Sequence, residues 1–349
     1  LLKNNEIADF NHGIAISTQD ESNGGISGVS VVDNTIEENT IGVKVSDFDA
    51  TDETINADIS NNKIKNNDHG IYVLDDTEGP ATTNPDGVAE LDDFIVNNNN
   101  IVDNTGSGVT NLGGGDTLDA TSNWWGDASG PSGAGVDGDG ASVSESVDVR
   151  PWLDAAFPEG SEINTATSSV SGGTATVDDP QVTSGISISN LDLEDDEEVE
   201  ITERSQPSQS DQTAVSIVVE DPDATAVEPV AAIEVSGPDP DDSATITIDL
   251  SASAINDPGN TEIVRIPDDG GAQRLDTDVV EQGEGTITFE AETPGFSTFV
   301  AAELTPADVS FDRSNLQVTP DTVDVGEEVT VSLDLTNTGD RSAAAGVAV

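Results

Sequence analysis

The residues best suited to chemistry are acidic side chains that recur at one position of a repeating pattern, two residues after an isoleucine. This position is occupied by Asp9, Glu38, Asn66 and Asp103. Paired carboxylates about 5 Å apart can cleave a glycosidic bond, and carboxylates are also ligands for Ca²⁺. The lysines that could serve as a base are Lys44, Lys63 and Lys65. If the chain is an enzyme, we expect its catalytic array to be Asp9, Glu38 and Asp103 with one of these lysines.

Two other groups of side chains contain residue types that bind metal ions. His12 and His69 are the only histidines and lie two repeats apart, which is roughly 10 Å if the repeats stack as strands. A metal–nitrogen bond is about 2 Å long, so one ion cannot join them. Asp137 and Asp139 lie in an Asp-Gly-Asp-Gly sequence that lacks the full ligand spacing of a calcium loop. We therefore expect turn histidines and no required cofactor, with Ca²⁺ at Asp137 and Asp139 as the alternative.

The elements that must position these residues are the repeats of residues 1–126. An Asn-x-Ile segment recurs, with Trp125 in place of the isoleucine in the last copy, and its asparagines are Asn5, Asn34, Asn62, Asn99 and Asn123. Successive asparagines of this set are 24 to 37 residues apart. Repeats of this length that are rich in short β-branched segments are typical of coils that stack about 4.8 Å apart around one apolar column. We expect the asparagines to lie at a left-handed bend and to bond from coil to coil. The recurring glycines are expected to form a second turn with positive φ; they are Gly13, Gly42, Gly70 and Gly108.

All the tryptophan of the chain lies at the end of the repeats, at Trp124, Trp125 and Trp152. Such rings could stack on sugars. A solenoid must also cover its last coil, and large aromatic side chains do this well. We expect these three residues to form that cap.

The repeat pattern and its closing segment together resemble the pectin-lyase-like, right-handed parallel β-helix proteins. The closing segment reads Asn123-Trp124-Trp125-Gly126 and then Val147-Asp148-Val149-Arg150-Pro151-Trp152. The resemblance covers residues 1 to about 157 and implies that fold. The family includes polysaccharide lyases and hydrolases as well as surface proteins without activity. Its lyases place Arg or Lys beside calcium, and residues 1–126 contain no arginine. This departure favours a protein without catalysis.

The extra length of the repeats falls after the glycine-led strand, in the acidic segments 17–25, 46–54 and 75–90. Insertions gathered on one edge of a solenoid can form a binding face, or they can be solvated loops. The sequence leaves both interpretations open.

The charge of the chain restricts its partners. The 349 residues carry 70 Asp and Glu against 10 Lys and Arg, a net charge of −60. The acidic residues alternate with Val, Ile and Ala in strand patterns, which favours a folded protein that needs molar salt to screen its self-repulsion. An acidic, calcium-loaded protein from ordinary salt is the alternative. With no basic patch, nucleic acid is excluded as a partner. There is no cysteine, and no signal peptide or membrane span is visible.

Two further domains follow the repeats at 1–157. Residues 158–303 alternate with period two, for example at 214–219, 244–250 and 285–291, which predicts an antiparallel β-sandwich-like domain. The sequence Thr293-Pro294-Gly295-Phe296-Ser297-Thr298-Phe299 resembles the PGF-pre-PGF module of archaeal surface proteins, although Ala272 replaces its usual tryptophan. Residues 304–349 are similar to the opening strands of an immunoglobulin-like CARDB module, of which we expect only the start.

Together these features predict an all-β chain from an exported surface protein of a halophilic archaeon. We expect its parallel β-helix to serve as a binding, adhesion or display surface, with polysaccharide or cell-envelope proteins as partners. The alternative is a β-helix polysaccharide lyase or glycoside hydrolase.

Overall fold

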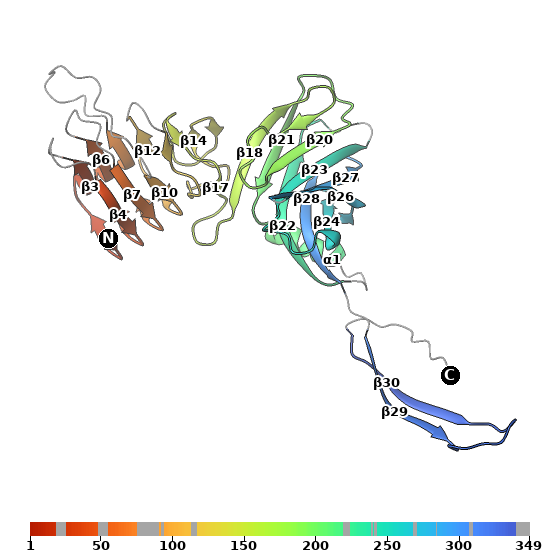
Figure 1. The fold of residues 1–349 in the computed structure, drawn as a ribbon. Coiled ribbons are helices and arrows are strands. Elements are labelled where there is room, and N and C mark those ends of the chain that lie inside the picture. Colours follow the sequence, from red (N-terminus) through yellow and green to blue (C-terminus); the bar gives the residue numbers. More distant parts are fainter. Residues whose placement is uncertain are drawn as a thin grey trace. The chain divides into compact units, whose positions relative to one another are not determined.

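A computed structural model gives the fold of the chain (Figure 1). It describes residues 1–18, 26–47, 55–74, 91, 94–112, 117–218, 224–238, 240, 243–267, 271–283, 285–306 and 310–339. Strands make up 55% of the structure and helices 4%, which confirms the all-β prediction. The chain divides into two compact units. The first comprises 1–165 with 180–182 and 202–205, and the second comprises the remaining residues.

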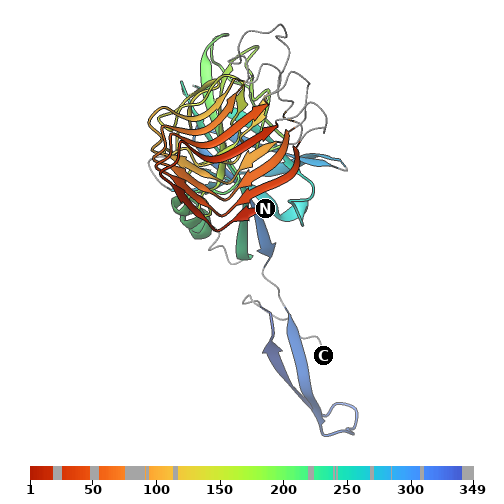
Figure 2. The same ribbon diagram turned by 90° about the vertical axis from the view of Figure 1, so that its left-hand side faces the viewer.

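The first unit begins with repeats that each contribute one strand to three parallel sheets (Figure 2). The first sheet contains β1 (Leu2–Lys3), β4 (Ile26–Val32), β7 (Ile55–Ser60), β10 (Ile95–Asn97), β13 (Leu118–Asp119) and β16 (Val147–Asp148). The second contains β2 (Glu6–Ala8), β5 (Thr35–Glu37), β8 (Lys63–Lys65) and β11 (Asn100–Val102). The third contains β3 (His12–Thr18), β6 (Ile41–Asp47), β9 (His69–Leu74) and β12 (Ser107–Asn111). We call one set of three strands a coil.

The core of the coils is the column of isoleucines from which the repeat was recognised. Ile36 pairs with Ile64, and Ile64 pairs with Ile101, in the same register of neighbouring parallel strands. All three side chains have 0% exposure. Each coil alone could not bury such residues, so the stacking itself supplies the hydrophobic stabilisation.

The five asparagines of the repeat form one hydrogen-bonded ladder. The Nδ2 of each donates to the Oδ1 of the next, at 3.0 Å from Asn5 to Asn34, 3.0 Å from Asn34 to Asn62, 2.9 Å from Asn62 to Asn99 and 3.0 Å from Asn99 to Asn123. The same Oδ1 atoms also accept from backbone N–H groups of the previous coil. The ladder thus satisfies backbone donors and acceptors that the bend leaves without sheet partners.

A second ladder, which the repeat pattern did not predict, lies three residues after the isoleucine. Asn39 Nδ2 donates to Asn67 Oδ1 at 3.0 Å, and Asn67 donates to Asn104 at 3.1 Å. In the first coil this position is Phe10, whose backbone N–H donates to Asn39 Oδ1 at 3.0 Å. The register signal was present in three coils, but the phenylalanine in the first coil obscures it.

The predicted backbone geometry of the bends is wrong by one residue. The left-handed residues are not the ladder asparagines but those directly before them, namely Asn4, Asp33, Asn61, Asn98 and Ser122, with φ between 55° and 58°. Ladder asparagines such as Asn34 and Asn62 instead have buried side chains that bond to the asparagine of the next coil. Short polar residues suit the left-handed position because their side chains can bond to the local backbone.

The repeat glycines also have another role than the predicted positive-φ turn. None of Gly13, Gly42, Gly70 and Gly108 is left-handed. A Cβ on Gly42 would lie 2.6 Å from the carbonyl oxygen of Gly70, and a Cβ on Gly70 would lie 2.4 Å from that of Gly108. Glycine is therefore required because neighbouring coils approach too closely for any side chain.

The ladder predicts a large difference between two asparagines of one coil. Asn62→Ala should lower the free energy of unfolding by about 1–3 kcal/mol, because it leaves buried partners without hydrogen bonds. The matched control is Asn66→Gly, since Asn66 is exposed and has a φ of 55° that glycine adopts freely. We expect a loss under about 1 kcal/mol there. Guanidinium unfolding at high salt, followed by tryptophan fluorescence, compares the two; equal losses would contradict a structural role for the ladder.

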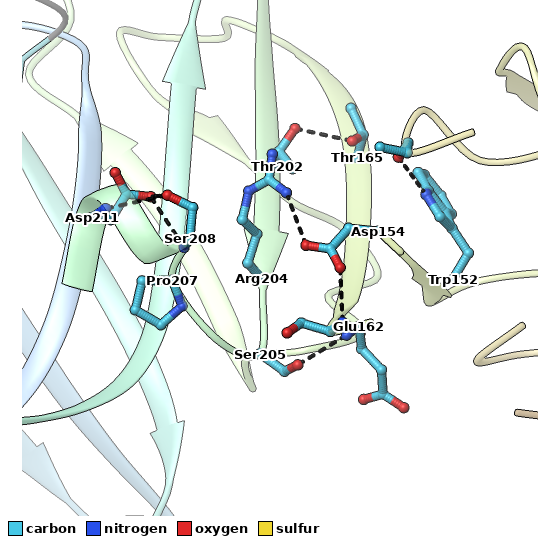
Figure 3. A network of polar contacts seen from close by, with 12 residues as sticks. Trp152, Asp154, Glu162, Thr165, Thr202, Arg204, Ser205, Pro207, Ser208 and Asp211 are labelled. Atoms are coloured by element: carbon cyan, nitrogen blue, oxygen red, sulfur yellow. Dashed lines mark hydrogen bonds and ion pairs between the residues drawn. The ribbon is translucent and has the colours of Figure 1, made fainter. Parts of the chain in front are cut away.

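The last coil is closed by two buried tryptophans. Trp125 and Trp152 are each 1% exposed and belong to the same core as the isoleucines. Trp152 lies in β17 (Trp152–Leu153), and its Nε1 donates to the Ala128 carbonyl at 3.0 Å (Figure 3). Gly130 lies directly against the Trp152 ring. The short strands β14 (Ser132–Gly133) and β15 (Val136–Asp137) pair antiparallel beside these residues. Trp124 is half-buried.

The remaining strands form two antiparallel sheets around a separate core. One sheet has the order β17-β18-β21-β22-β28-β24-β25 and the other β19-β20-β23-β27-β26. Their bounds are β18 Glu162–Ser169, β19 Ala175–Thr176, β20 Gly185–Ser189, β21 Glu198–Arg204, β22 Ala224–Ser236, β23 Ala244–Ser251, β24 Thr261–Ile266, β25 Gln273–Arg274, β26 Thr277–Gln282, β27 Thr286–Thr293 and β28 Thr298–Pro306. A 3₁₀ turn spans Pro258–Asn260. Outside these sheets, β29 (Phe311–Thr319) and β30 (Thr330–Asn337) form a hairpin.

The predicted strand at 214–219 is wrong, because helix α1 (Gln209–Val218) occupies this segment. Its start is fixed by a reciprocal cap: Ser208 Oγ accepts from the Asp211 N–H at 3.2 Å, and an Asp211 carboxylate oxygen accepts from the Ser208 N–H at 3.2 Å (Figure 3). Val215 then packs, fully buried, with Ala232 and Val264. The Ser-x-x-Asp signal outweighs the local alternation of apolar residues.

Candidate functional site

The four positions of the predicted carboxylate array share an unusual backbone. Asp9, Glu38, Asn66 and Asp103 are all exposed and left-handed, with φ between 55° and 66°. Asp and Asn are residue types that such a bend favours for conformational reasons alone. Asn66 also separates Glu38 from Asp103, so Asp9 and Glu38 are the only carboxylates of this column in adjacent coils.

The three lysines considered as bases are not gathered at this column. Lys44 lies in β6 of the third sheet, whereas Lys63 and Lys65 lie in β8 of the second sheet. Lys65 Nζ forms an ion pair with Glu37 at 2.8 Å. This hydrogen bond and the charge of Glu37 raise the pKa of Lys65 above its ordinary value, with further contributions from Glu38 and Asp103. A lysine base needs the opposite shift, so Lys65 is poorly suited to proton abstraction.

The Asp-Gly-Asp-Gly sequence at Asp137 and Asp139, which suggested a calcium site, has glycines that close packing explains. Both aspartate side chains are exposed. Added Cβ atoms on Gly138 and Gly140 would lie 2.3 Å and 2.5 Å from the Gly130 carbonyl oxygen, so the glycines serve close packing. Within the described ranges, no group of three or more His, Asp or Glu residues could hold a metal ion.

The two histidines are the first residues of β3 and β9 in the third sheet, and both are half-buried. His12 pairs with Ile41 and Ile41 pairs with His69, so the histidines are two coils apart in one register. His69 also contacts residues that the repeat pattern did not predict as part of a site. Its Nδ1 lies 2.9 Å from Ser107 Oγ, and Ser107 Oγ lies 2.7 Å from Thr110 Oγ1.

An aromatic ring completes this cluster. The rings of His69 and Tyr72 meet edge to face, with centroids 5.0 Å apart and planes at 65°. Tyr72, Lys44 and Thr110 occupy one register of β9, β6 and β12. Because strand side chains alternate and their neighbours in sequence are buried, all three face outward. We call Lys44, His69, Tyr72, Ser107 and Thr110 the His69 face.

The His69 ring is held in place by close packing. An added Cβ on Gly106 would lie 2.8 Å from Cε1 and 3.0 Å from Nδ1 of the ring. The ring is therefore confined between the Gly106 backbone, the Ser107 hydroxyl and the Tyr72 side chain. A cluster fixed in this way offers hydroxyl, imidazole and aromatic groups without the entropic cost of ordering them on binding.

The acidic segments predicted as one alternative binding face fall largely outside the described residues. The structure describes the ends 17–18 in β3 and 46–47 in β6, but not 19–25, 48–54 or 75–90. Among the described helices, none has the length and apolar character needed to cross a membrane. No protein-family model, curated protein or solved structure gives a significant match to this chain.

Proposed function

We propose that this chain belongs to an exported surface protein whose first unit binds polysaccharide on the His69 face. The observation that carries the proposal is the fixed cluster of His69, Ser107 and Thr110 beside the only tyrosine of the chain. Hydroxyl and imidazole groups exchange hydrogen bonds with sugar hydroxyls, and the apolar face of a sugar stacks on an aromatic ring.

The finer fold assigned in this proposal is a right-handed parallel β-helix of the pectin-lyase-like class. Support comes from the three parallel sheets, the two asparagine ladders and the tryptophan cap. The hand follows from the strong preference of parallel crossover connections for right-handed paths. The two antiparallel sheets that follow are proposed to be a sandwich of the PGF-pre-PGF type, and the hairpin the start of a CARDB-like module.

The proposed setting is the surface of a cell living in concentrated salt. The net charge of −60 supports it, because such a chain repels itself unless salt screens the carboxylates. Surface display agrees with a solenoid that offers a long outer face, and envelope proteins remain further partners. Catalysis is not part of the proposal, since the carboxylate column is interrupted by Asn66 and Lys65 is paired with Glu37.

The test is a substitution that removes the ring from the face. Tyr72→Ala should weaken binding to isolated polysaccharides by at least about tenfold, which corresponds to the loss of one stacked ring. Phe10→Ala is the matched control, because Phe10 is 58% exposed in the same unit but lies between β2 and β3, outside the strands of the third sheet. Affinity electrophoresis or calorimetry at high salt measures both.

Two results would contradict the proposal. One is equal binding by the Tyr72 and Phe10 variants. The other is turnover: release of unsaturated or reducing ends from a polysaccharide, abolished by Glu38→Gln, would favour a lyase or hydrolase that uses the carboxylate column.

A further inference from the structure

The hydrogen-bonding chain on the His69 face restricts the chemistry of its ligand, an inference that rests on the proposed function. Ser107 Oγ is within hydrogen-bond distance of both His69 Nδ1, at 2.9 Å, and Thr110 Oγ1, at 2.7 Å. Within the described residues, His69 Nε2 and the Thr110 hydroxyl have no other hydrogen-bond partner. Among the residues that the structure describes, this hydrogen-bonding chain therefore has two ends without a protein partner, which a ligand could satisfy.

The hydrogens of such a chain can be arranged in two ways when the imidazole is neutral. In the first, Thr110 donates to Ser107, Ser107 donates to Nδ1, and the ring hydrogen lies on Nε2. In the second, Nδ1–H donates to Ser107, Ser107 donates to Thr110, and Thr110 donates to the ligand. In the first arrangement Nε2 is the donor end and the Thr110 oxygen the acceptor end; in the second these roles are exchanged. Either way, the hydrogen-bonding chain from His69 to Thr110 presents one donor and one acceptor.

We infer that the His69 face selects a neutral, hydroxyl-rich glycan over a uronate polymer. Sugar hydroxyls both donate and accept, so a pair of them satisfies both ends in either arrangement. A carboxylate can only accept hydrogen bonds. It can satisfy the donor end of the hydrogen-bonding chain, but at the acceptor end it places one acceptor against another. An acceptor placed against this end is unfavourable because it forms no hydrogen bond there. The net charge of −60 further opposes the approach of an anionic polymer.

Competition between two polymers tests this inference. In about 2 M NaCl, where charge effects are screened, and at about pH 8.5, above the range in which imidazoles usually titrate, a neutral glucan should bind at least tenfold more tightly than polygalacturonate. Thr110→Val removes one end of the chain and should weaken glucan binding about tenfold, the factor expected for one hydrogen bond. Thr35→Val, on β5 of the second sheet, is the matched control and should leave binding unchanged.

The outcomes separate this inference from the proposed function. If polygalacturonate binds as tightly as glucan, and Tyr72→Ala abolishes both, the binding face stands but the preference for neutral sugars is wrong. If glucan binds and Thr110→Val has no effect, the hydrogen-bonding chain does not recognise the ligand. If neither polymer binds, the proposed function and this inference fail together.

Discussion

Gly70→Ala is expected to destabilise the first unit by about 2–4 kcal/mol, at or above the upper range for inserting one methyl group into a packed core. The added Cβ would lie 2.4 Å from the carbonyl oxygen of Gly108 and 3.0 Å from Nδ2 of Asn104. The first atom belongs to backbone and cannot rotate away. The coils that contain β9 and β12 would have to separate, which would also weaken the second asparagine ladder between Asn67 and Asn104.

The measurement is guanidinium unfolding at high salt with tryptophan fluorescence, which reports on this unit because all three tryptophans lie in it. Gly28→Asn is the matched control. Gly28 belongs to β4, its φ is 69°, and nothing lies within 4 Å of an added Cβ. Asparagine tolerates this backbone, so a loss under about 1 kcal/mol is expected. Similar losses in both variants would show that backbone flexibility, and not coil spacing, determines the effect at Gly70.

Removal of salt is expected to have the largest effect of all. In molar NaCl the chain should be compact, and below a few tenths molar it should lose cooperative β-structure. The screening length grows from about 3 Å at 1 M to about 10 Å at 0.1 M, which exceeds the spacing of about 4.8 Å between stacked coils. Repulsion between carboxylates of neighbouring coils, such as Asp9 and Glu38, would then act across the whole stack.

Circular dichroism over a salt series, in buffer freed of calcium by a chelator, measures this dependence. Sucrose at matched osmolality is the control, because it favours compact states without screening charge. Salt should preserve the structure where sucrose preserves it only in part. Full retention of β-structure in dilute, calcium-free buffer would remove the argument for a high-salt setting, while the binding face would be unaffected.

The sequence by itself determined the coils, their register and their core. A fixed spacing of asparagine, isoleucine and glycine can be satisfied only when equivalent residues of successive repeats lie side by side, because no single repeat buries its own isoleucine. This constraint predicted the pairing of Ile36 with Ile64 and Ile101, and the alignment of Asn5, Asn34, Asn62, Asn99 and Asn123. Period-two patterns likewise predicted strands at 244–250 and 285–291, where β23 and β27 lie.

Local detail needed the three-dimensional structure. The alternation at 214–219 suggested a strand, but the Ser208–Asp211 cap and the contacts of Val215 favour a helix. The repeat glycines suggested turns, whereas the decisive quantity is the distance from an added Cβ to the backbone of the next coil. Such distances depend on how coils stack and are not contained in residue preferences.

The candidate site shows most clearly which contacts depend on the tertiary structure. His69 and Tyr72 are close in sequence, but Ser107 and Thr110 come from the next coil, and His69 and Ser107 are 38 residues apart. Aligning Gly108 with Gly70 in the repeat places Ser107 beside His69 and Thr110 beside Tyr72, as in the structure. That register alone does not show that Ser107 Oγ lies within hydrogen-bond distance of both His69 Nδ1 and Thr110 Oγ1. The hydrogen-bonding chain between His69 and Thr110 exists only because the hydroxyls of one coil lie beside the imidazole of its neighbour, a contact that tertiary stacking creates.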